Sequence, residues 1–350
     1  MSSSPAAWLP SRLPIIQAPM AGSQDERLAL AVHAAGALGS LPAAMLSLDG
    51  LDAALGKLQA VAGNAYNVNF FCHTPPQPDD VALARWRQAL APFYAEAGLD
   101  PHAVAAAASR EPFNAAMAEL LEAYRPAVVS FHFGLPSPEL LARVQRLGCR
   151  VISSATTVRE ARWLAAQGVD GIIAQGLEAG GHRGHFLDTD PAHQLGTMAL
   201  LPQVVAAVRL PVIAAGGIVD AASVRAALAL GAAAVQTGTA YLLADEATTG
   251  PVHRAALVEP DTPTVLTRLF SGGLARGIVN RLMRELGPVS PLAPAFPQAS
   301  GALAPLRAAA EKAGRGDFSP LWSGQNRSAC RAAPAAEITA ALARGLLPSS

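Results

Sequence analysis

The stretch "RVISSATTVREARWLAAQGVDGIIAQG", residues 150–176, decides the fold because it contains one complete strand–helix–strand unit. Its first and last segments are short apolar runs without polar alternation, which is typical of strands covered on both faces in a parallel sheet. The segment between them is helical in pattern, with Thr157 and Glu160 as a capping box and Gly168 at its end. The stretch therefore predicts a βαβ unit.

The same rhythm recurs along the first two thirds of the chain. Eight short apolar runs, each ending in small or polar residues, lie at residues 14–20, 36–45, 67–71, 127–134, 150–156, 171–176, 211–217 and 233–240. Asp220 and Gly231 bound a helical segment between the last two runs, as its N-cap and its end. Eight strands alternating with helices predict an α/β fold, a closed (β/α)₈ barrel of the TIM type.

Two ranges break this rhythm and predict an added domain. Residues 75–124 open with "TPPQPDD" and continue as alanine-rich helix, which is too long for a simple loop. After about residue 250 no further strand is expected, and alanine-rich helical sequence follows. We therefore expect a barrel over residues 1–74 and 125–250, and a helical cap over residues 75–124 and 251–350 that excludes water from a site.

Composition excludes several classes of function. The 350 residues carry 26 basic and 26 acidic side chains, so there is no basic footprint for nucleic acid and no polybasic membrane patch. Cys72, Cys149 and Cys330 are too far apart for a CxxC metal site and too few for a disulfide framework. Neither a secretory signal nor a long apolar span is visible. We expect a cytoplasmic protein that acts on a small molecule.

Two glycine clusters follow the seventh and eighth predicted strands, where barrels of this type often bind phosphate. Glycines allow backbone N–H groups to approach an anion closely, and Gly216, Gly217, Gly238 and Thr239 are the candidates. The alternative is that Gly216 and Gly217 only form a tight turn. There is no G-x-G-x-x-G and no complete P-loop, which argues against a Rossmann NAD site and a Walker ATPase.

The stretch "AQGLEAGGHRGHF", residues 174–186, follows the sixth predicted strand. Gly180 and Gly181 bring the backbone close to the barrel mouth, where His182 projects and can take a proton at neutral pH. A structural role for His182 and a metal site are the alternatives. The possible metal ligands are His182, His185, Asp188, Asp190 and His193. Because no second cluster supports this spacing, no metal is predicted, and His185 and His193 are expected to be solvated.

Amide side chains stand at three strand ends, at Asn69, Gln175 and Gln236. Amides donate and accept hydrogen bonds, which suits the edge of a heteroaromatic ring. The thioether of Met20 suits the flat face of such a ring. Each residue alone is more typical of an ordinary core position, but together they favour a flavin-like ligand.

Seven stretches of the chain resemble nitronate monooxygenases, also called 2-nitropropane dioxygenases. They are "PIIQAPMAG", "NVNFF", "AQGLEAGGHRG", "PVIAAGGI", "VQTGTAYL", "FSGGLARGIVNRLMRE" and "LWSGQ". The resemblance covers residues 14 to about 325 and implies an FMN-dependent (β/α)₈ barrel with a helical cap. It implies that FMN contacts Met20, Asn69, Gln175, Gly180, Gly217, Gln236, Thr237, Gly238 and Thr239. His182 matches the catalytic histidine of the family.

The reaction that this resemblance implies is a detoxification. Alkyl nitronates such as propionate 3-nitronate are oxidised by O₂ to a carbonyl compound and nitrite, and the flavin carries one electron from the nitronate toward O₂. A histidine beside the substrate could be protonated and stabilise the anion, or neutral and abstract the α-proton of a nitroalkane. Both a monomer and a homodimer are compatible with the sequence.

Two features depart from the family pattern. Gly273 and Leu274 stand where a basic residue and a proline are expected. No tyrosine follows Tyr241, although the cap of the family often places tyrosines and a lysine near the substrate. Phe296 and Lys312 are the residues that could take their place.

Three other functions remain open from the sequence. One is an FMN-dependent, NAD(P)H-using reductase of the enoyl-[acyl-carrier-protein] reductase or quinone reductase type. The second is an isomerase or lyase that binds a phosphate ligand without redox chemistry. The third is a binding protein without catalysis, because this barrel carries many functions.

Overall fold

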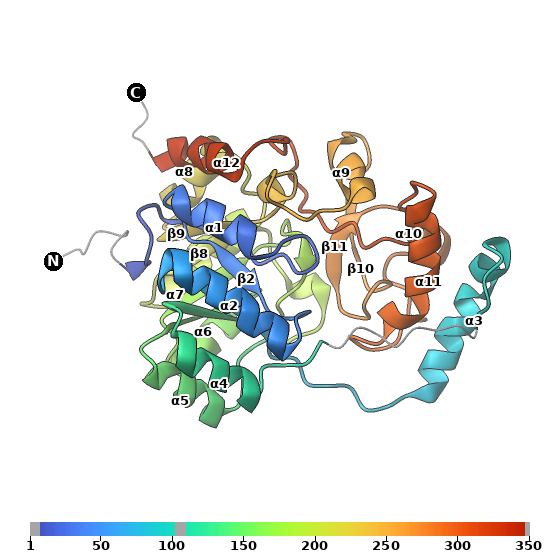
Figure 1. Ribbon diagram of the computed structural model, residues 1–350, viewed down its shortest axis with the longest axis horizontal. Coiled ribbons are helices and arrows are strands. Elements are labelled where there is room, and N and C mark those ends of the chain that lie inside the picture. Colours follow the sequence, from blue (N-terminus) through green and yellow to red (C-terminus); the bar gives the residue numbers. More distant parts are fainter. Residues whose placement is uncertain (1–7, 102–109, 347–350) are drawn as a thin grey trace.

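The computed structural model describes residues 8–101 and 110–346, and a parallel barrel forms its centre (Figure 1). The eight barrel strands are β1 (Ile15–Gln17), β2 (Ser40–Pro42), β3 (Asn67–Phe71), β4 (Val128–His132), β5 (Arg150–Ala155), β6 (Gly171–Gln175), β8 (Val212–Ala215) and β9 (Ala234–Thr237). Neighbours pair in parallel in the order β1-β9-β8-β6-β5-β4-β3-β2. A parallel bridge between Ile16 and Leu38 closes the ring. The predicted barrel and its eight strands are confirmed.

A ring of helices surrounds the barrel and buries its outer face. Its members are α1 (Glu26–Ala34), α2 (Leu48–Ala62), α4 (Ala115–Tyr124), α5 (Pro138–Arg146), α6 (Val158–Ala166), α7 (Thr197–Ala207), α8 (Ala221–Ala229) and α12 (Ala335–Ala343). The largest apolar core lies between these helices and the strands. Trp8 and Leu9 pack against Ile152 and Ile173 in a separate apolar cluster of the barrel. Both faces of each strand are therefore covered, which is why the strands read as uninterrupted apolar runs.

Two helices within the ranges that the sequence assigned to the cap pack on the barrel. Helix α4 contacts α2 and α5, and α12 contacts α1 and α8, so that α12 completes the ring. An alanine-rich helical pattern indicates that one face is buried but not which surface covers it. Residues 102–109 of the expected insertion lie outside the described part of the chain.

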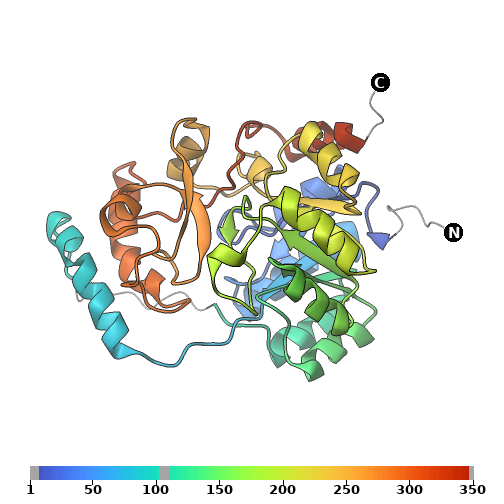
Figure 2. The ribbon, with the colours of Figure 1, turned by 180° about the vertical axis from the view of Figure 1, so that it is seen from behind.

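The cap lies on one side of the barrel and combines helices with a small sheet (Figures 1 and 2). Its helices are α3 (Asp80–Glu96), α9 (Pro251–Val258), α10 (Arg281–Leu286) and α11 (Ala299–Lys312). Helix α3 lies at the far end of the cap, where Trp86 Nε1 donates to the carbonyl of Ala299 at 3.0 Å and the Tyr94 hydroxyl donates to that of Ala302 at 2.7 Å. These bonds and an apolar cluster join α3 to α11.

The expectation that no strand follows residue 250 is wrong. Strand β10 (Thr264–Thr267) pairs antiparallel with β11 (Ala275–Ile278), and β11 pairs antiparallel with the two-residue strand β7 (Gly181–His182). Strands this short leave no clear periodicity in the sequence. Short 3₁₀ helices in the described part of the chain include η2 (Pro191–His193), η3 (Thr239–Tyr241) and η4 (Arg344–Leu346). Among the residues described, no helix is long and apolar enough to cross a membrane.

Candidate active site

One pocket gathers every site residue that the sequence predicted. It lies at the carboxyl ends of the barrel strands, which is where barrels of this type carry their active sites. Its lining includes His182 together with Met20, Asn69, Gln175, Gly180, Gly217, Gln236, Thr237, Gly238 and Thr239. Cap residues such as Trp322 also line it. The pocket is therefore built by the barrel and the cap together.

The glycine-rich loop after β6 is shaped by contacts that allow no side chain. A Cβ atom at Gly180 would lie 2.5 Å from the backbone nitrogen of Gly324, and Gly181 has a φ of 71°. His182 then pairs with Ala275 of β11, so the cap sheet fixes the strand that carries this histidine. Two stretches that are distant in the sequence, "EAGGHRG" and "FSGGLARG", thus form one structural unit.

Two side chains, those of Gln175 and His132, hold the backbone of His182. Gln175 Nε2 donates to the carbonyl oxygen of His182 at 3.0 Å, and Gln175 Oε1 accepts from the backbone of Gly184 at 2.8 Å. His132 Nε2 lies 3.1 Å from the same carbonyl oxygen, and its Nδ1 lies 3.0 Å from Ser154 Oγ. Burial lowers the pKa of His132 to about 4, so the ring is neutral. Both residues position the loop in the structure.

A fully buried arginine, Arg183, bonds to the backbone at the start of this loop. Arg183 donates to the carbonyl oxygens of Gln175 and Gly176 at 2.7 and 2.6 Å, and to Gln194 Oε1 at 2.7 Å. Burial lowers its pKa to about 9. The side chain that follows the histidine therefore points away from the pocket and ties the loop to the end of β6.

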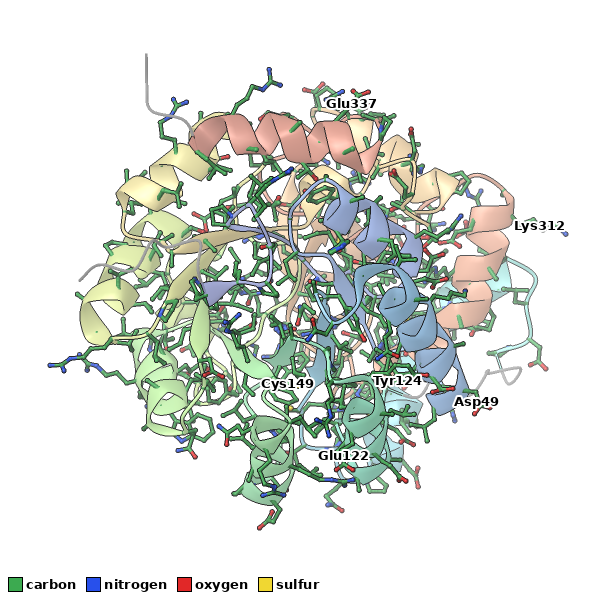
Figure 3. All side chains as sticks on the ribbon, turned by 60° about the vertical axis from the view of Figure 1, so that its left-hand side comes forward. Asp49, Glu122, Tyr124, Cys149, Lys312 and Glu337 are labelled. Atoms are coloured by element: carbon green, nitrogen blue, oxygen red, sulfur yellow. The ribbon has the colours of Figure 1, made fainter. Side chains whose placement is uncertain are left out.

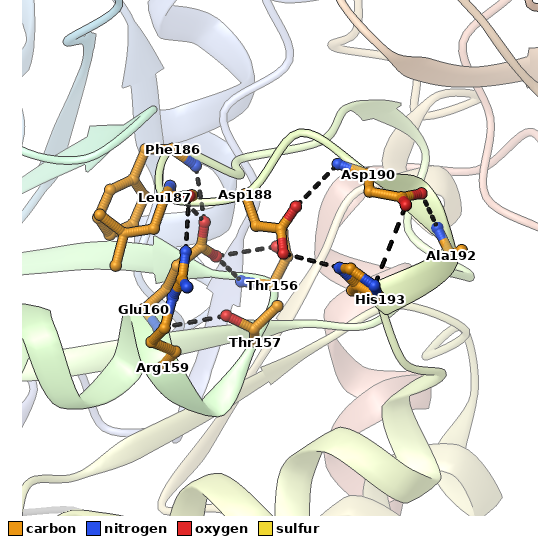
Figure 4. A network of polar contacts seen from close by, with 10 residues as sticks. All are labelled: Thr156, Thr157, Arg159, Glu160, Phe186, Leu187, Asp188, Asp190, Ala192 and His193. Carbon is orange, nitrogen blue, oxygen red and sulfur yellow. Dashed lines mark hydrogen bonds and ion pairs between the residues drawn. The ribbon is translucent and has the colours of Figure 1, made fainter.

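Glu160 holds the far end of the loop (Figure 4). Its Oε2 accepts from the backbone and hydroxyl of Thr156 at 2.7 and 2.8 Å, and its Oε1 accepts from the backbones of Phe186 and Leu187 at 2.6 and 3.1 Å. Thr157 is the N-cap of α6, as predicted, but Glu160 does not return the capping-box bond. The carboxylate instead accepts hydrogen bonds from the backbone of the loop.

The imidazole of His182 lies in an aromatic enclosure. The rings of Phe71, Phe133, Phe296 and Trp322 have centroids 5.2 to 6.1 Å from it. Nε2 lies 2.8 Å from the hydroxyl of Ser271, which is itself buried. Burial holds the pKa of His182 well below its ordinary value, and the nearby Arg110 and His132 lower it further. The ring is therefore neutral at physiological pH, which favours the neutral of the two states that the sequence left open.

The glycine loops after β8 and β9 form the opposite part of the pocket. Gly216 and Gly217 have φ values of 120° and 73°, which favour glycine. Thr237 Oγ1 donates to the carbonyl of Ile218 at 2.7 Å, and Thr239 Oγ1 accepts from the backbone of Gly324 at 2.9 Å. Gln236 differs from these threonines, because its Oε1 is buried and has no hydrogen-bond partner among the residues that the structure describes.

Several site residues carry no signal that the sequence analysis used. Ser271 and Trp322 lie within the quoted stretches "FSGGLARG" and "LWSGQ", but neither was assigned a role. His132 is the last residue of β4, so the search for polar residues at strand ends could have found it. Arg110 lines the pocket and lies in a loop without a recognisable motif.

Phe296 and Lys312, which could replace the cap tyrosines and lysine of the family, differ in their distance from the site. Phe296 lies 5.2 Å from the ring of His182, whereas Lys312 is exposed and points away from the molecule (Figure 3). A Cβ atom at Gly273 would lie 3.0 Å from the Phe296 ring and 3.3 Å from His182. The absence of a side chain at position 273 thus makes room for these two rings.

The five possible metal ligands named from the sequence do not converge. His193 pairs with Asp188 at 2.8 Å on the surface (Figure 4). His182 lies in the pocket. Over residues 8–101 and 110–346, no group of three or more His, Cys, Asp or Glu side chains could hold a metal ion. His185 is half-buried rather than solvated, and burial lowers its pKa.

The sequence profile of the family described as nitronate monooxygenase matches residues 6–345. The chain belongs to the nitronate monooxygenase family. A nitronate monooxygenase of Paraburkholderia phytofirmans is 42% identical over 343 residues, which cover 96% of this chain and 93% of that relative. A nitronate monooxygenase of Pseudomonas aeruginosa is 40% identical, with 95% and 96% covered. The family predicted from the seven stretches is confirmed.

A solved structure agrees with this membership of the nitronate monooxygenase family. The nitroalkane oxidase of Streptomyces ansochromogenes superimposes with a TM-score of 0.89 at 39% identity. The match covers 98% of each chain, so it includes the cap as well as the barrel.

Proposed function

We propose that this chain is an FMN-dependent enzyme that oxidises alkyl nitronates, such as propionate 3-nitronate, with O₂ to a carbonyl compound and nitrite. The observation that carries the proposal is the place of His182 in an aromatic enclosure, in the same pocket as two glycine loops. The names of the relatives, nitronate monooxygenase and nitroalkane oxidase, support the same chemistry.

The residues after β8 and β9 fit FMN. The buried, unpartnered Oε1 of Gln236 can accept a hydrogen bond from a ring N–H. The absence of side chains at Gly216 and Gly217 leaves backbone N–H groups free to approach a phosphate. When bound, FMN would supply the redox chemistry, taking an electron from the nitronate that passes on to O₂. Gln175 acts at least in part by holding the loop that carries His182. We assign further contacts with FMN to the lining residues Met20, Asn69, Gly180, Gly217, Thr237, Gly238 and Thr239.

His182 would act as a base. A neutral imidazole can take the α-proton of a nitroalkane and so form the nitronate inside the pocket. A preformed nitronate does not need this step. Ser271 Oγ lies 2.8 Å from Nε2 and therefore controls which ring nitrogen keeps its lone pair. The aromatic rings exclude water, which lowers the pKa of His182 and keeps the ring unprotonated before the substrate binds.

The first test is the visible spectrum of the purified protein, followed by addition of propionate 3-nitronate without oxygen. We expect a yellow protein whose flavin absorption changes with the nitronate, and nitrite formation with O₂ uptake when air is admitted. A yellow protein that is inert to nitronate but bleached by NAD(P)H would favour the reductase alternative. A colourless protein that does not take up added FMN would contradict the flavin assignment.

The second test replaces the base. His182→Asn should retain FMN and lose at least about a hundredfold in turnover of neutral nitroalkanes, which is the usual contribution of a general base. Turnover of preformed nitronates should fall much less. His193→Asn is the matched control, because His193 is an exposed histidine in the same segment of chain. Equal activity of the two variants on nitroalkanes would contradict the role of His182.

A further inference from the structure

Arg110 enters the pocket from the segment between α3 and α4 and lines the same cavity as His182. Three residues later, the backbone N–H of Phe113 donates to the carbonyl oxygen of Phe71 at 2.8 Å. Phe113 is buried in the barrel core, so the end of β3 anchors this segment from one side. The chain is thus anchored to the barrel three residues after Arg110.

The guanidinium of Arg110 has no acidic partner in the part of the chain that the structure describes. Its Nη1 is buried and makes no hydrogen bond to residues 8–101 or 110–346. Two other cap arginines have an acidic partner, Arg307 in Glu311 and Arg315 in Asp317. Burial lowers the pKa of Arg110, and the nearby Arg307 lowers it further. A partly buried cation without an acidic partner is costly, and a bound anion would reduce this cost.

The surroundings of Arg110 define where that anion lies. The guanidinium carbon stands 5.9 Å from the centroid of the Phe296 ring, and the same ring lies 5.2 Å from the imidazole of His182. Arg110 is the one lysine or arginine among the lining residues identified. The lining carboxylate, Glu178, is already bonded to the backbone and hydroxyl of Thr197. The cation and the base therefore contact one aromatic ring.

We infer that Arg110 is the anion-binding residue of the substrate pocket and pairs with a planar two-oxygen anionic group of the substrate. Guanidinium is suited to this task because it donates two parallel hydrogen bonds to such a group. The group can be the nitronate itself or a carboxylate at the other end of the substrate. The identity of the substrate rests on the proposed function, whereas the binding of an anion does not.

The first experiment measures binding without turnover. Sodium nitrate, a planar oxyanion, is titrated into the FMN-loaded protein while the flavin absorption and the unfolding temperature are followed. Wild type should respond to nitrate, and Arg110→Met should bind it about 10- to 100-fold more weakly, as expected for the loss of a charged hydrogen-bonded pair. Arg110→Lys, which keeps the charge, should recover part of the affinity. Arg315→Met, an exposed arginine in the same domain, should bind nitrate like wild type.

The second experiment separates the two sources of the anion. The kcat/KM of each variant is measured with ethyl nitronate, which has no carboxylate, and with propionate 3-nitronate, which has one. A loss of about 10- to 100-fold with both substrates places the nitronate on Arg110. A loss confined to propionate 3-nitronate places the carboxylate there. Both outcomes support the inference.

Three outcomes distinguish failure of the inference from failure of the proposed function. Equal nitrate affinity and equal kcat/KM in wild type and Arg110→Met would overturn the role of Arg110. Loss of FMN from a folded Arg110→Met would also overturn it, because the guanidinium would then serve the cofactor. A wild type that binds nitrate through Arg110 but oxidises neither nitronate would retain the anion site and refute the proposed function.

Discussion

Glu160 offers a quantitative test of how the histidine loop is held. Each of its two carboxylate oxygens accepts two hydrogen bonds, one pair from Thr156 and the other from the backbones of Phe186 and Leu187. Glu160→Gln keeps the size of the side chain but turns one oxygen into an NH₂ group that faces two donors. Two of the four bonds are lost whichever way the amide turns.

The expected loss of stability follows from these bonds. A hydrogen bond to a charged group contributes about 1.5–3 kcal/mol, and rotation of the Thr156 hydroxyl recovers part of the loss. We therefore expect Glu160→Gln to be destabilised by about 3 kcal/mol, roughly a hundredfold rise in the unfolded population. The assay is the midpoint of urea unfolding, together with amide hydrogen exchange over residues 183–190.

Asp188→Asn is the matched control. Asp188 lies in the same loop, but its ion pair with His193 is at the surface and should contribute little. Its unfolding midpoint should stay near that of wild type. The reasoning is refuted if Glu160→Gln unfolds at the wild-type urea concentration and its loop amides exchange at wild-type rates.

Two further predictions concern the base and the buried histidines. Ser271→Ala removes the 2.8 Å contact to His182 Nε2 and should lower kcat/KM for nitroalkanes about five- to tenfold, with FMN content unchanged; an unchanged rate would show that Ser271 does not position the ring. Burial lowers the pKa of His132 and His253 to about 4, below their value of about 6.5 in the unfolded chain. Their contribution to stability is complete above pH 6.5 and is lost as the pH falls toward 4. The urea midpoint should already decrease between pH 6.5 and 5.5, and a midpoint that is constant over that interval would contradict the burial of these rings.

The barrel and the place of its site could be predicted because their signals are local. A strand covered on both faces needs an apolar run, and the carboxyl ends of all such strands meet at one end of the barrel. Glycines with positive φ, such as Gly181 and Gly217, mark where the backbone turns toward the pocket. The residues that follow each run therefore predict the part of the pocket lining that the barrel supplies.

The other features of the site and the cap depend on contacts between segments that are distant in the sequence. Nothing near His182 in the sequence indicates that it pairs with Ala275, and nothing near Arg110 indicates that it reaches the same cavity. Lys312 and Arg110 are both cap-range cations, yet only the tertiary packing tells which one is exposed. The same holds for α4 and α12, whose sequences are helical but do not specify the barrel as their partner.

Because the chain returns to the barrel as α12, members of this fold can diverge in the cap while the barrel stays intact. Both cap segments begin and end in the barrel, so each is a long loop on the face that carries the site, and neither is a terminal appendage. Shortening the chain from its carboxyl end would remove the last helix of the barrel before it removed any of the cap sheet. New substrate preferences can therefore arise by exchange of these loops within an intact scaffold, provided that position 275 still pairs with His182.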